Sequence, residues 1–365
     1  MSVRVLHQCL AGAAPGDAIT DQAFLIQRWL RQAGIHSDIF AESVHPLLEN
    51  QVRSVVQLRR EEAQEGIMYH HGIGTEIAET LCAWNVPLFM VYHNITPPAF
   101  VRTFDPRLAA QLEQGRAQLH TLRAHTVLAV ADSAYNEREL REAGYEQTDV
   151  LPIVLHAEPY DQPINPDLAR GLRERGPNLL FVGRLVPNKR QDDLIKLLWF
   201  YKRIRPQARL ILVGSSWLPT YSQWLRGLAF DVGLGDSVWF TEHVPERDLV
   251  TFYRSADVYV SMSEHEGFGK PFIESMYCGL PIVAYAAAAV PDTVGDAGIL
   301  FTRKDFEAVA ELIDVVVHDT ALRERLIQNG RRRVQRMLEP AVRQRFMEFL
   351  ERFTYLRQRS ASSQP

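Results

Sequence analysis

Cysteine is scarce in this sequence of 365 residues, and long charge-free hydrophobic runs are missing. Cys9, Cys82 and Cys278 lie far apart, are odd in number and have no C-x-x-C spacing, so they predict neither a disulfide framework nor a zinc site and favour a reducing compartment. The longest charge-free apolar stretch, 275–291, is interrupted by Gly279 and Pro281, which excludes it as a membrane span. The N-terminus also lacks the hydrophobic segment of a secretory signal. We therefore expect a cytoplasmic protein, at most peripheral at the inner face of the plasma membrane.

Several motifs of well-known chemistry are absent as well. The sequence contains no G-x-S-x-G, no H-E-x-x-H, no P-loop and no EF-hand loop. It also lacks a D-x-D triplet, one common way of holding a divalent ion on a nucleoside diphosphate. If a diphosphate binds, cations and helix ends must neutralise it, and no obligatory metal or other cofactor is expected.

Charge is unevenly distributed along the chain. The net charge is −4, which argues against a nucleic-acid partner held by counterion release. Residues 1–150 contain no lysine, 12 arginines and 18 acidic residues, a net of −6, whereas the remainder holds 28 basic and 26 acidic residues, a net of +2. An anionic ligand is therefore expected in the second half, and the acidic first half argues against tight membrane binding.

The composition and the order of patterns predict two α/β domains. Hydrophobic residues make up 46% and charged residues 23%, which is typical of globular proteins, and the length suggests about two domains. Short apolar runs alternate with amphipathic helical patterns, as in parallel sheets covered on both faces. Strands are expected at 3–7, 37–41, 66–70, 87–92, 126–131 and 149–154, and then at 178–182, 208–213, 237–241, 257–261, 281–285 and 298–301.

Residues 156–178 interrupt this rhythm with four prolines, so they are interpreted as a linker with one helical turn. We expect two doubly wound, Rossmann-like domains, 1–160 and 161–340, that face a central cleft. A disordered tail is expected at 358–365.

The first chemical candidate follows a predicted strand of the second half. Gly183 ends that strand, and Arg184 and Lys189 come before the next helix. Ligands of open α/β sheets bind at the carboxyl ends of strands, and a guanidinium, an ammonium and a helix N-terminus all favour phosphate oxygens. Taken alone, both cations could equally be solvated surface residues.

The second candidate is the stretch 263–279. Gly267 and Gly269 leave backbone N–H groups open before a helix that starts at Pro271. Glu266 precedes this helix and Glu274 lies one turn inside it, so both carboxylates can accept hydrogen bonds from sugar or ribose hydroxyls. The alternatives are an acid stabilised by the helix dipole and glycines required by a turn.

The third candidate lies in the first half. His93 and Asn94 follow a predicted strand, where a polar pair faces the expected cleft, although a lone histidine is as often structural. The loop 10–17 joins the first strand to the first helix, and its Gly12 and Gly16 would let a ligand approach the backbone.

Together these residues resemble the retaining glycosyltransferases of family 4 (group 1), which have the GT-B fold. The resemblance rests on VGRLVPNK at 182–189, on EHEGFGKPFIES at 264–275 with its Glu-x7-Glu pair, and more loosely on YHNITPP at 92–98 and ADSAYN at 131–136. It covers nearly the whole chain. It implies that a C-terminal helix, about 341–357, crosses back to the first domain.

The resemblance also implies roles for individual residues. Arg184 and Lys189 would hold the diphosphate of a nucleotide-sugar, and Glu274 would accept the ribose hydroxyls. Glu266 and the backbone of 267–269 would hold the sugar, with His93 beside its anomeric carbon. The implied catalytic residues are His93, Glu266, Arg184 and Lys189. The implied donor-binding residues are Gly12, Gly16, Gly183, Arg184, Lys189, Gly214, Val244, Glu266, Gly267, Phe268, Gly269, Lys270 and Glu274.

Asp17 and Asn94 are expected on the acceptor side. Lys270 departs from the apolar or small residue of many relatives, and it could either add charge at the diphosphate or pair with an acid. Gly214 and Val244 mark the two loops where base selection is expected.

The predicted activity is metal-independent transfer of a hexosyl unit from a GDP- or UDP-sugar to a hydroxyl of a glycan, lipid-linked or small-molecule acceptor. The resemblance implies retention of anomeric configuration by a same-face reaction, with Glu266 positioning the sugar. Alternatives are another GT-B enzyme, an epimerase or a phosphorylase, and a non-catalytic nucleotide-sugar-binding protein. Donor interconversion without acceptor, a need for inorganic phosphate, or binding without turnover would distinguish them.

Overall fold

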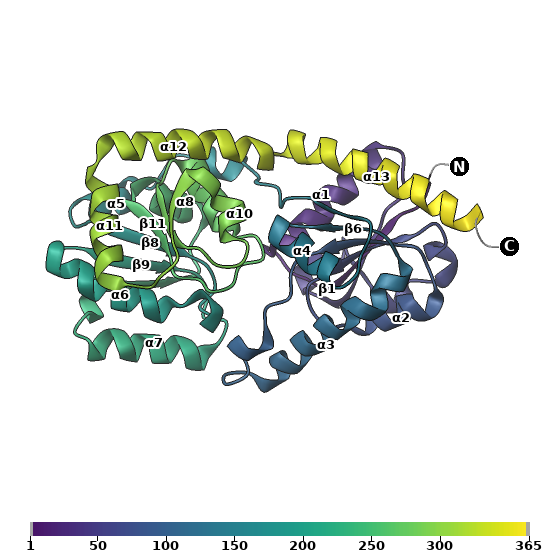
Figure 1. Ribbon diagram of the computed structural model, residues 1–365, viewed down its shortest axis with the longest axis horizontal. Helices are drawn as coiled ribbons and strands as arrows, with labels where there is room; N and C mark the ends of the chain where they lie inside the picture. The colour runs from purple at the N-terminus through teal and green to yellow at the C-terminus, as the bar shows by residue number, and fades with distance from the viewer. Residues whose placement is uncertain (1–2, 363–365) are drawn as a thin grey trace. The chain divides into compact units, whose positions relative to one another are not determined.

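The computed structural model describes residues 3–362, which form two compact α/β units (Figure 1). The first unit comprises the chain up to Ala99, then Pro106–Val154, and the chain from Pro340 onward. The second unit comprises Phe100–Asp105 and Leu155–Glu339. Within 3–362, no helix is both long enough and apolar enough to cross a membrane.

The first unit is built on a seven-stranded parallel sheet in the order β3-β2-β1-β4-β5-β6-β7. Its strands are β1 His7–Ala13, β2 Ile39–Val44, β3 Arg53–Ser54, β4 Ile67–His71, β5 Leu88–Tyr92, β6 Thr126–Ala131 and β7 Thr148–Val150. Its α-helices are α1 Ala18–Gln32, α2 Glu76–Trp84, α3 Pro106–Leu122, α4 Ala134–Glu142 and α13 Glu339–Ser362. The strand order reverses between β1 and β4, which is the Rossmann-like arrangement.

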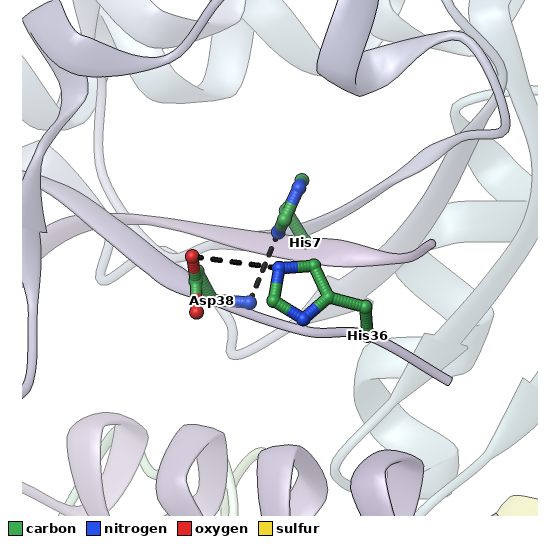
Figure 2. Close-up of side chains that lie close together, drawn as sticks. All are labelled: His7, His36 and Asp38. Carbon is green, nitrogen blue, oxygen red and sulfur yellow. Dashed lines mark hydrogen bonds and ion pairs between the residues drawn. The ribbon is translucent and has the colours of Figure 1, made fainter. Parts of the chain in front are cut away.

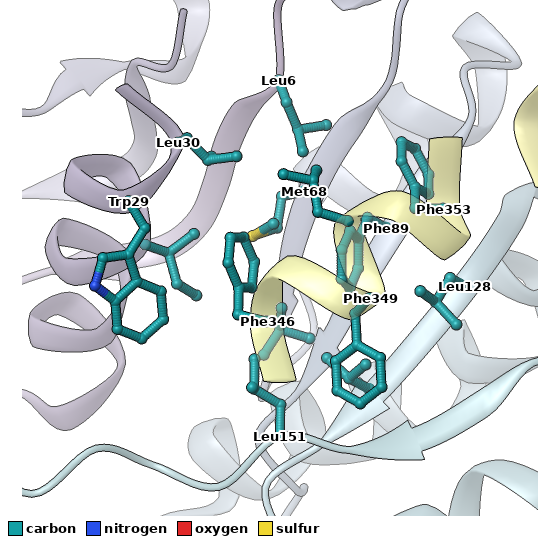
Figure 3. Close-up of a cluster of buried hydrophobic side chains, with 14 of the residues drawn as sticks. Leu6, Trp29, Leu30, Met68, Phe89, Leu128, Leu151, Phe346, Phe349 and Phe353 are labelled. Carbon is teal, nitrogen blue, oxygen red and sulfur yellow. The ribbon is translucent and has the colours of Figure 1, made fainter. Parts of the chain in front are cut away.

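The C-terminal helix α13 completes the core of the first unit. Figure 3 shows Phe346, Phe349 and Phe353 of α13 beside Trp29 of α1 and Phe89 of β5. The rings of Phe346 and Trp29 have centroids 5.5 Å apart, and those of Phe353 and Phe89 are 5.4 Å apart. The prediction that the C-terminal helix returns to the N-terminal region is therefore confirmed.

The second unit is built on a six-stranded parallel sheet in the order β10-β9-β8-β11-β12-β13. Its strands are β8 Asn178–Val182, β9 Arg209–Val213, β10 Val238–Glu242, β11 Val258–Ser261, β12 Ile282–Tyr285 and β13 Gly298–Phe301. Its α-helices are α5 Pro166–Arg173, α6 Gln191–Ile204, α7 Pro219–Asp231, α8 Glu246–Ser255, α9 Lys270–Cys278, α10 Val290–Val294, α11 Phe306–His318 and α12 Thr320–Val334. The predicted fold class, two doubly wound α/β sheets, is confirmed.

Three local expectations are corrected. The first strand runs over His7–Ala13 and not 3–7, so Gly12 lies inside β1 and the loop before α1 is shorter than expected. The segment 156–178 is more ordered than a linker, because Asn165 caps α5 and α5 buries Ala169 and Leu172. Helix α13 reaches Ser362, so 358–362 are helical where a disordered tail was expected, and 363–365 lie outside the described residues.

The three cysteines are free thiols. Cys9 is buried, while Cys82 and Cys278 are half-buried. Burial raises the pKa of Cys278 to about 12, so this thiol stays protonated and unreactive at neutral pH.

Candidate functional site

Two loops of the second unit meet at the carboxyl ends of neighbouring strands β8 and β11. The loop after β8 carries Arg184 and Lys189, and the loop after β11 carries Glu266. Asn188 ties them together, since its Nδ2 donates to the His265 carbonyl at 3.0 Å and its own carbonyl accepts from the Glu264 N–H at 2.9 Å. The sequence motifs that are 75 residues or so apart thus form one structural feature, as expected for the ligand edge of an open parallel sheet.

Lys189 forms an ion pair with Glu266 across these loops. The Lys189 side chain is 21% exposed and the Glu266 side chain 10%, so the pair is only partly screened by water. The ammonium has three donors and Glu266 uses one, which leaves Lys189 able to bind an anion while still holding Glu266.

Arg184 is exposed at the end of β8 and stacks on an aromatic ring. Its guanidinium carbon lies 4.9 Å from the centroid of Trp217, in the loop between β9 and α7. No ion pair with a carboxylate is found for Arg184 among the described residues, so its forked donors stay available to a phosphate. A cation–π contact of this kind orients the side chain without using its N–H groups.

The glycines of this edge are required by close backbone approach. Gly214 follows β9 with φ of +144°, and a Cβ there would lie 2.2 Å from the Gly183 carbonyl oxygen. Gly269, with φ of +84°, is the N-cap of α9, and a Cβ there would lie 2.4 Å from the ring of Phe272. Phe268 between Gly267 and Gly269 is buried, and its carbonyl accepts from the Thr293 hydroxyl at 2.6 Å. The loop that precedes α9 is therefore rigidly placed.

Glu274 lies one turn into α9 and is held by two tyrosines that the sequence did not reveal. Its Oε1 accepts from the Tyr160 hydroxyl and its Oε2 from the Tyr253 hydroxyl, both at 2.5 Å. Burial and the Glu274 charge raise the pKa of both phenols. Lys270 Nζ lies 3.9 Å from Glu274 Oε1, so of the two roles left open for Lys270 the structure favours pairing with an acid. Val244 is half-buried in the loop after β10, apart from these contacts.

A chain of buried polar side chains in the first unit leads from the interior of β1 to the corresponding edge of the sheet. Gln8 in β1, His70 in β4, His93 after β5 and Asp132 after β6 belong to four neighbouring strands. His70 Nε2 lies 2.9 Å from Gln8 Oε1, His70 Nδ1 lies 2.9 Å from His93 Nε2, and His93 Nδ1 lies 3.0 Å from Asp132 Oδ2. Sequence reasoning found His93 alone, because alternating apolar runs give no sign of which polar residues share an edge.

The remaining predicted residues of the first unit have internal partners. Asn94, with φ of +70°, donates through Nδ2 to Asn136 Oδ1 at 3.0 Å and to Glu139 Oε2 at 2.7 Å. Asp17 caps α1 by accepting from the Thr20 N–H at 3.0 Å. Gly16, with φ of +74°, occupies the turn just before this cap, and no atom lies within 4 Å of a Cβ built there.

One group in the described part of the chain brings potential metal ligands together, away from these edges. Figure 2 shows His7, His36 and Asp38, whose ligand atoms lie within 4.8 Å of one another. Asp38 already pairs with Arg31 and Arg53, each at 3.2 Å. His7 Nδ1 accepts the Asp38 backbone N–H at 3.0 Å, so the neutral ring carries its proton on Nε2. Neither nitrogen of His7 is then a free lone pair, and the residues do not fit a metal site.

Comparison with known proteins assigns a family to the second unit. Residues 169–333 match the family described as "Glycosyl transferases group 1". Through this segment, which is less than half of the chain, the second unit is similar to the group 1 glycosyltransferases. Both motif loops lie inside the matched region, so the resemblance inferred from their residues is confirmed.

Curated relatives match a stretch of similar length. The D-inositol 3-phosphate glycosyltransferase of Acidothermus cellulolyticus is 35% identical over 168 residues, which cover 44% of this chain and 37% of the relative. A GDP-mannose-dependent alpha-(1-6)-phosphatidylinositol monomannoside mannosyltransferase of Mycolicibacterium smegmatis is 30% identical over 169 residues, which cover 42% of this chain and 44% of the relative. The matched region thus spans less than half the length of these group 1 relatives.

Solved structures match almost the entire fold. Anabaena HepE in complex with UDP and glucose matches with a TM-score of 0.73 at 21% identity. The superposition covers 96% of this chain and 99% of the HepE chain. Sucrose-phosphate synthase from Thermosynechococcus elongatus matches with a TM-score of 0.70 at 20% identity, over 99% of this chain and 100% of the synthase chain. These likenesses establish the GT-B fold for both units.

Proposed function

We propose that this chain is a retaining glycosyltransferase that moves a hexosyl unit from a nucleoside-diphosphate sugar to a hydroxyl group. The observation that carries the proposal is the joined edge of β8 and β11, where Arg184, Lys189, Glu266 and the N-terminus of α9 come together. The family match and the GT-B fold support it.

The cations of this edge suit the leaving group. As the glycosidic bond breaks, negative charge grows on the diphosphate, and preorganised positive groups stabilise that charge more than they stabilise the ground state. Arg184 supplies a forked donor set fixed against Trp217, and Lys189 supplies an ammonium fixed against Glu266. No step of this reaction needs a metal ion.

The two carboxylates divide the recognition of hydroxyl groups. Each oxygen of Glu274 accepts one tyrosine hydroxyl and keeps a second lone pair, with which it would accept ribose hydroxyls. Glu266 would accept hydroxyls of the transferred sugar, and its ion pair with Lys189 holds the carboxylate in place for that task. We assign Glu266 to positioning of the sugar and not to nucleophilic attack.

We assign the acceptor to the first unit, which carries His93. The named relatives use GDP-mannose with phosphatidylinositol mannoside, or D-inositol 3-phosphate, and HepE binds UDP and glucose. For this chain we propose a GDP- or UDP-hexose donor and a glycan, inositol-type or lipid-linked acceptor. The reaction would take place in the cytoplasm, with any membrane contact peripheral.

The proposal is tested with Arg184→Ala, compared with Arg203→Ala as a matched control. Arg203 is also exposed and stacks on a tryptophan, Trp199, at 3.6 Å, but it lies in α6 away from the β8 edge. Arg184→Ala should lower kcat for transfer by about a hundredfold or more while the protein stays folded. Near-normal turnover in Arg184→Ala would contradict the diphosphate assignment.

The donor is identified by a thermal-shift screen of GDP- and UDP-sugars and of GDP and UDP alone. A ligand that binds only the folded protein at about a hundred times its Kd stabilises it by about 2.7 kcal/mol. Binding of a nucleotide-sugar without transfer to any acceptor would instead favour a non-catalytic protein, and donor interconversion without acceptor would favour an epimerase.

A further inference from the structure

The protonation of His93 follows from the chain of hydrogen bonds in which it lies. The chain starts at Gln8, whose Nε2 donates to the Ala23 carbonyl of α1 at 2.9 Å. This contact fixes the orientation of the amide, because a reversed amide would place two oxygens against each other. Gln8 Oε1 is therefore the atom that faces His70.

The Gln8 oxygen fixes the tautomer of His70. Because Gln8 Oε1 can only accept, His70 Nε2 carries a hydrogen and donates it. His70 is buried, and burial lowers the pKa of its imidazole well below the ordinary value, so the ring is neutral. Its other nitrogen, Nδ1, is then a bare lone pair directed at His93.

His93 consequently lies between two acceptors. On one side its Nε2 faces the lone pair of His70 Nδ1, and on the other its Nδ1 faces the carboxylate of Asp132. Both side chains of the His93–Asp132 pair are only 2% exposed, and Asp132 Oδ1 has no hydrogen-bond partner among the described residues. A buried carboxylate with a single partner needs a compensating positive charge.

We infer that His93 is a buried imidazolium, protonated on both ring nitrogens, and that Asp132 and His70 are the positioning residues that hold it in that state. The pair His93–Asp132 is then neutral as a whole, and neither ring nitrogen is left to accept a proton from a substrate. The side chain of His93 is buried while the residue as a whole is half-exposed, so ligands meet its backbone. The protonation state of His93 does not depend on the proposed function, whereas its effect on kcat rests on that function.

The role of Asp132 and His70 is to fix the chain segment at the end of β5. The imidazolium, which follows β5, bonds to β4 through His70 and to the end of β6 through Asp132. It therefore connects the carboxyl ends of three neighbouring strands. The residue after it, Asn94, adopts the left-handed conformation, which is uncommon for residues other than glycine although asparagine tolerates it best. Loss of the charge would loosen this segment without removing any group that contacts the donor diphosphate.

The protonation state is tested by nuclear magnetic resonance of the full-length protein with isotope-labelled histidines at pH 7, using His93→Gln for assignment. The expected result is two protonated ring nitrogens for His93 and a single Nε2–H tautomer for His70. A neutral His93 with one protonated nitrogen would overturn the inference, whatever the protein transfers.

Three variants identify what holds the charge. Asp132→Asn should convert His93 to a neutral ring, since the counter-charge is lost. His70→Gln should preserve the imidazolium, because the Gln amide can accept from His93 and donate to Gln8. Asp149→Asn is the matched control: it removes a carboxylate from β7 that pairs with Arg345 at 2.7 Å, and His93 should be unchanged. An imidazolium that persists in Asp132→Asn would contradict the inference.

Activity then separates positioning from binding. Asp132→Asn should lower kcat by about a hundredfold, as expected when the segment at the end of β5 is displaced by about 1 Å, while the affinity for the nucleoside diphosphate alone stays unchanged. His70→Gln should retain most of the activity. Unchanged kcat in folded Asp132→Asn would overturn the positioning role; absence of transfer in the unsubstituted protein would refute the proposed function and leave the resonance result standing.

Discussion

The two units carry polar groups at the same edge of similar sheets, yet these groups are used in opposite ways. In the first unit, Gln8, His70, His93 and Asp132 are buried and bond to one another. In the second, Arg184 is exposed, Lys189 is partly exposed and Glu266 is buried. The comparison teaches that an edge whose buried polar groups bond mainly to one another fixes backbone geometry, whereas an edge with a partly exposed cation and an exposed one suits the charged ligand that we propose for it.

The largest effect that would sharpen this contrast is expected from Phe346→Ala. The side chain is fully buried between Trp29 and Phe89, so its removal should destabilise the first unit by about 3–5 kcal/mol. Urea unfolding followed by hydrogen exchange should show the loss in the first unit and not in the second. Tyr355→Ala is the control, because that side chain on the same helix is 58% exposed and should be close to neutral.

Lys189→Ala should break the charge arrangement of the second unit. It removes a cation from the edge that we propose for the diphosphate and leaves the Glu266 carboxylate, 10% exposed, without its partner. We expect kcat for transfer to fall by about a hundredfold to a thousandfold. Lys202→Ala serves as the control, since Lys202 bonds to Ser237 and lies outside the edge. Equal activities of the two variants would show that Lys189 is only structural.

Tyr253→Phe should produce an intermediate effect. Glu274 would keep Tyr160 but lose one charge-assisted hydrogen bond, of a kind worth about 1.5–3 kcal/mol. The freed Oε2 should be less well oriented, so KM for the donor should rise about tenfold with little change in kcat. The same substitution at Tyr277, which bonds to exposed Asp161, should leave KM unaltered.

The prediction with the smallest effect at neutral pH concerns the pH dependence of the first unit, through His71. Burial lowers the pKa of His71 to about 4, so between pH 6.5 and about 4 the unfolded chain binds a proton that the folded chain does not. Stability is fully present above pH 6.5 and should fall by about 1.4 kcal/mol per pH unit for this residue as the pH drops. His71→Gln should reduce the slope of unfolding free energy against pH, while exposed His36→Gln should not.

The sequence predicted the second unit better than the first. Each strand from β8 to β13 was expected within a residue or so, because continuous apolar runs end at glycine or proline. In the first unit, β1 was misplaced since its HQCLAGA sequence is rich in polar and small residues, and the two-residue β3 gave no pattern. The two charged motifs of the proposed donor edge were visible because the residues within each motif are close together in the chain.

The residues that orient those groups could not be found in the same way. Tyr160 is more than a hundred residues from Glu274, and Asp132 reaches His93 only through the pairing of β5 with β6. Such contacts depend on which strands become neighbours, and a tyrosine or aspartate in a short motif carries no sign of its distant partner.

The position of α13 in the chain has a consequence for synthesis on the ribosome. Phe346, Phe349 and Phe353 belong to the core of the first unit but are translated after the whole of the second. At about 5–20 residues per second, the apolar face that they cover stays open for roughly ten seconds or more while the chain emerges. During that interval the nascent first unit presents a hydrophobic surface to chaperones, and premature termination after α12 would leave that surface permanently uncovered.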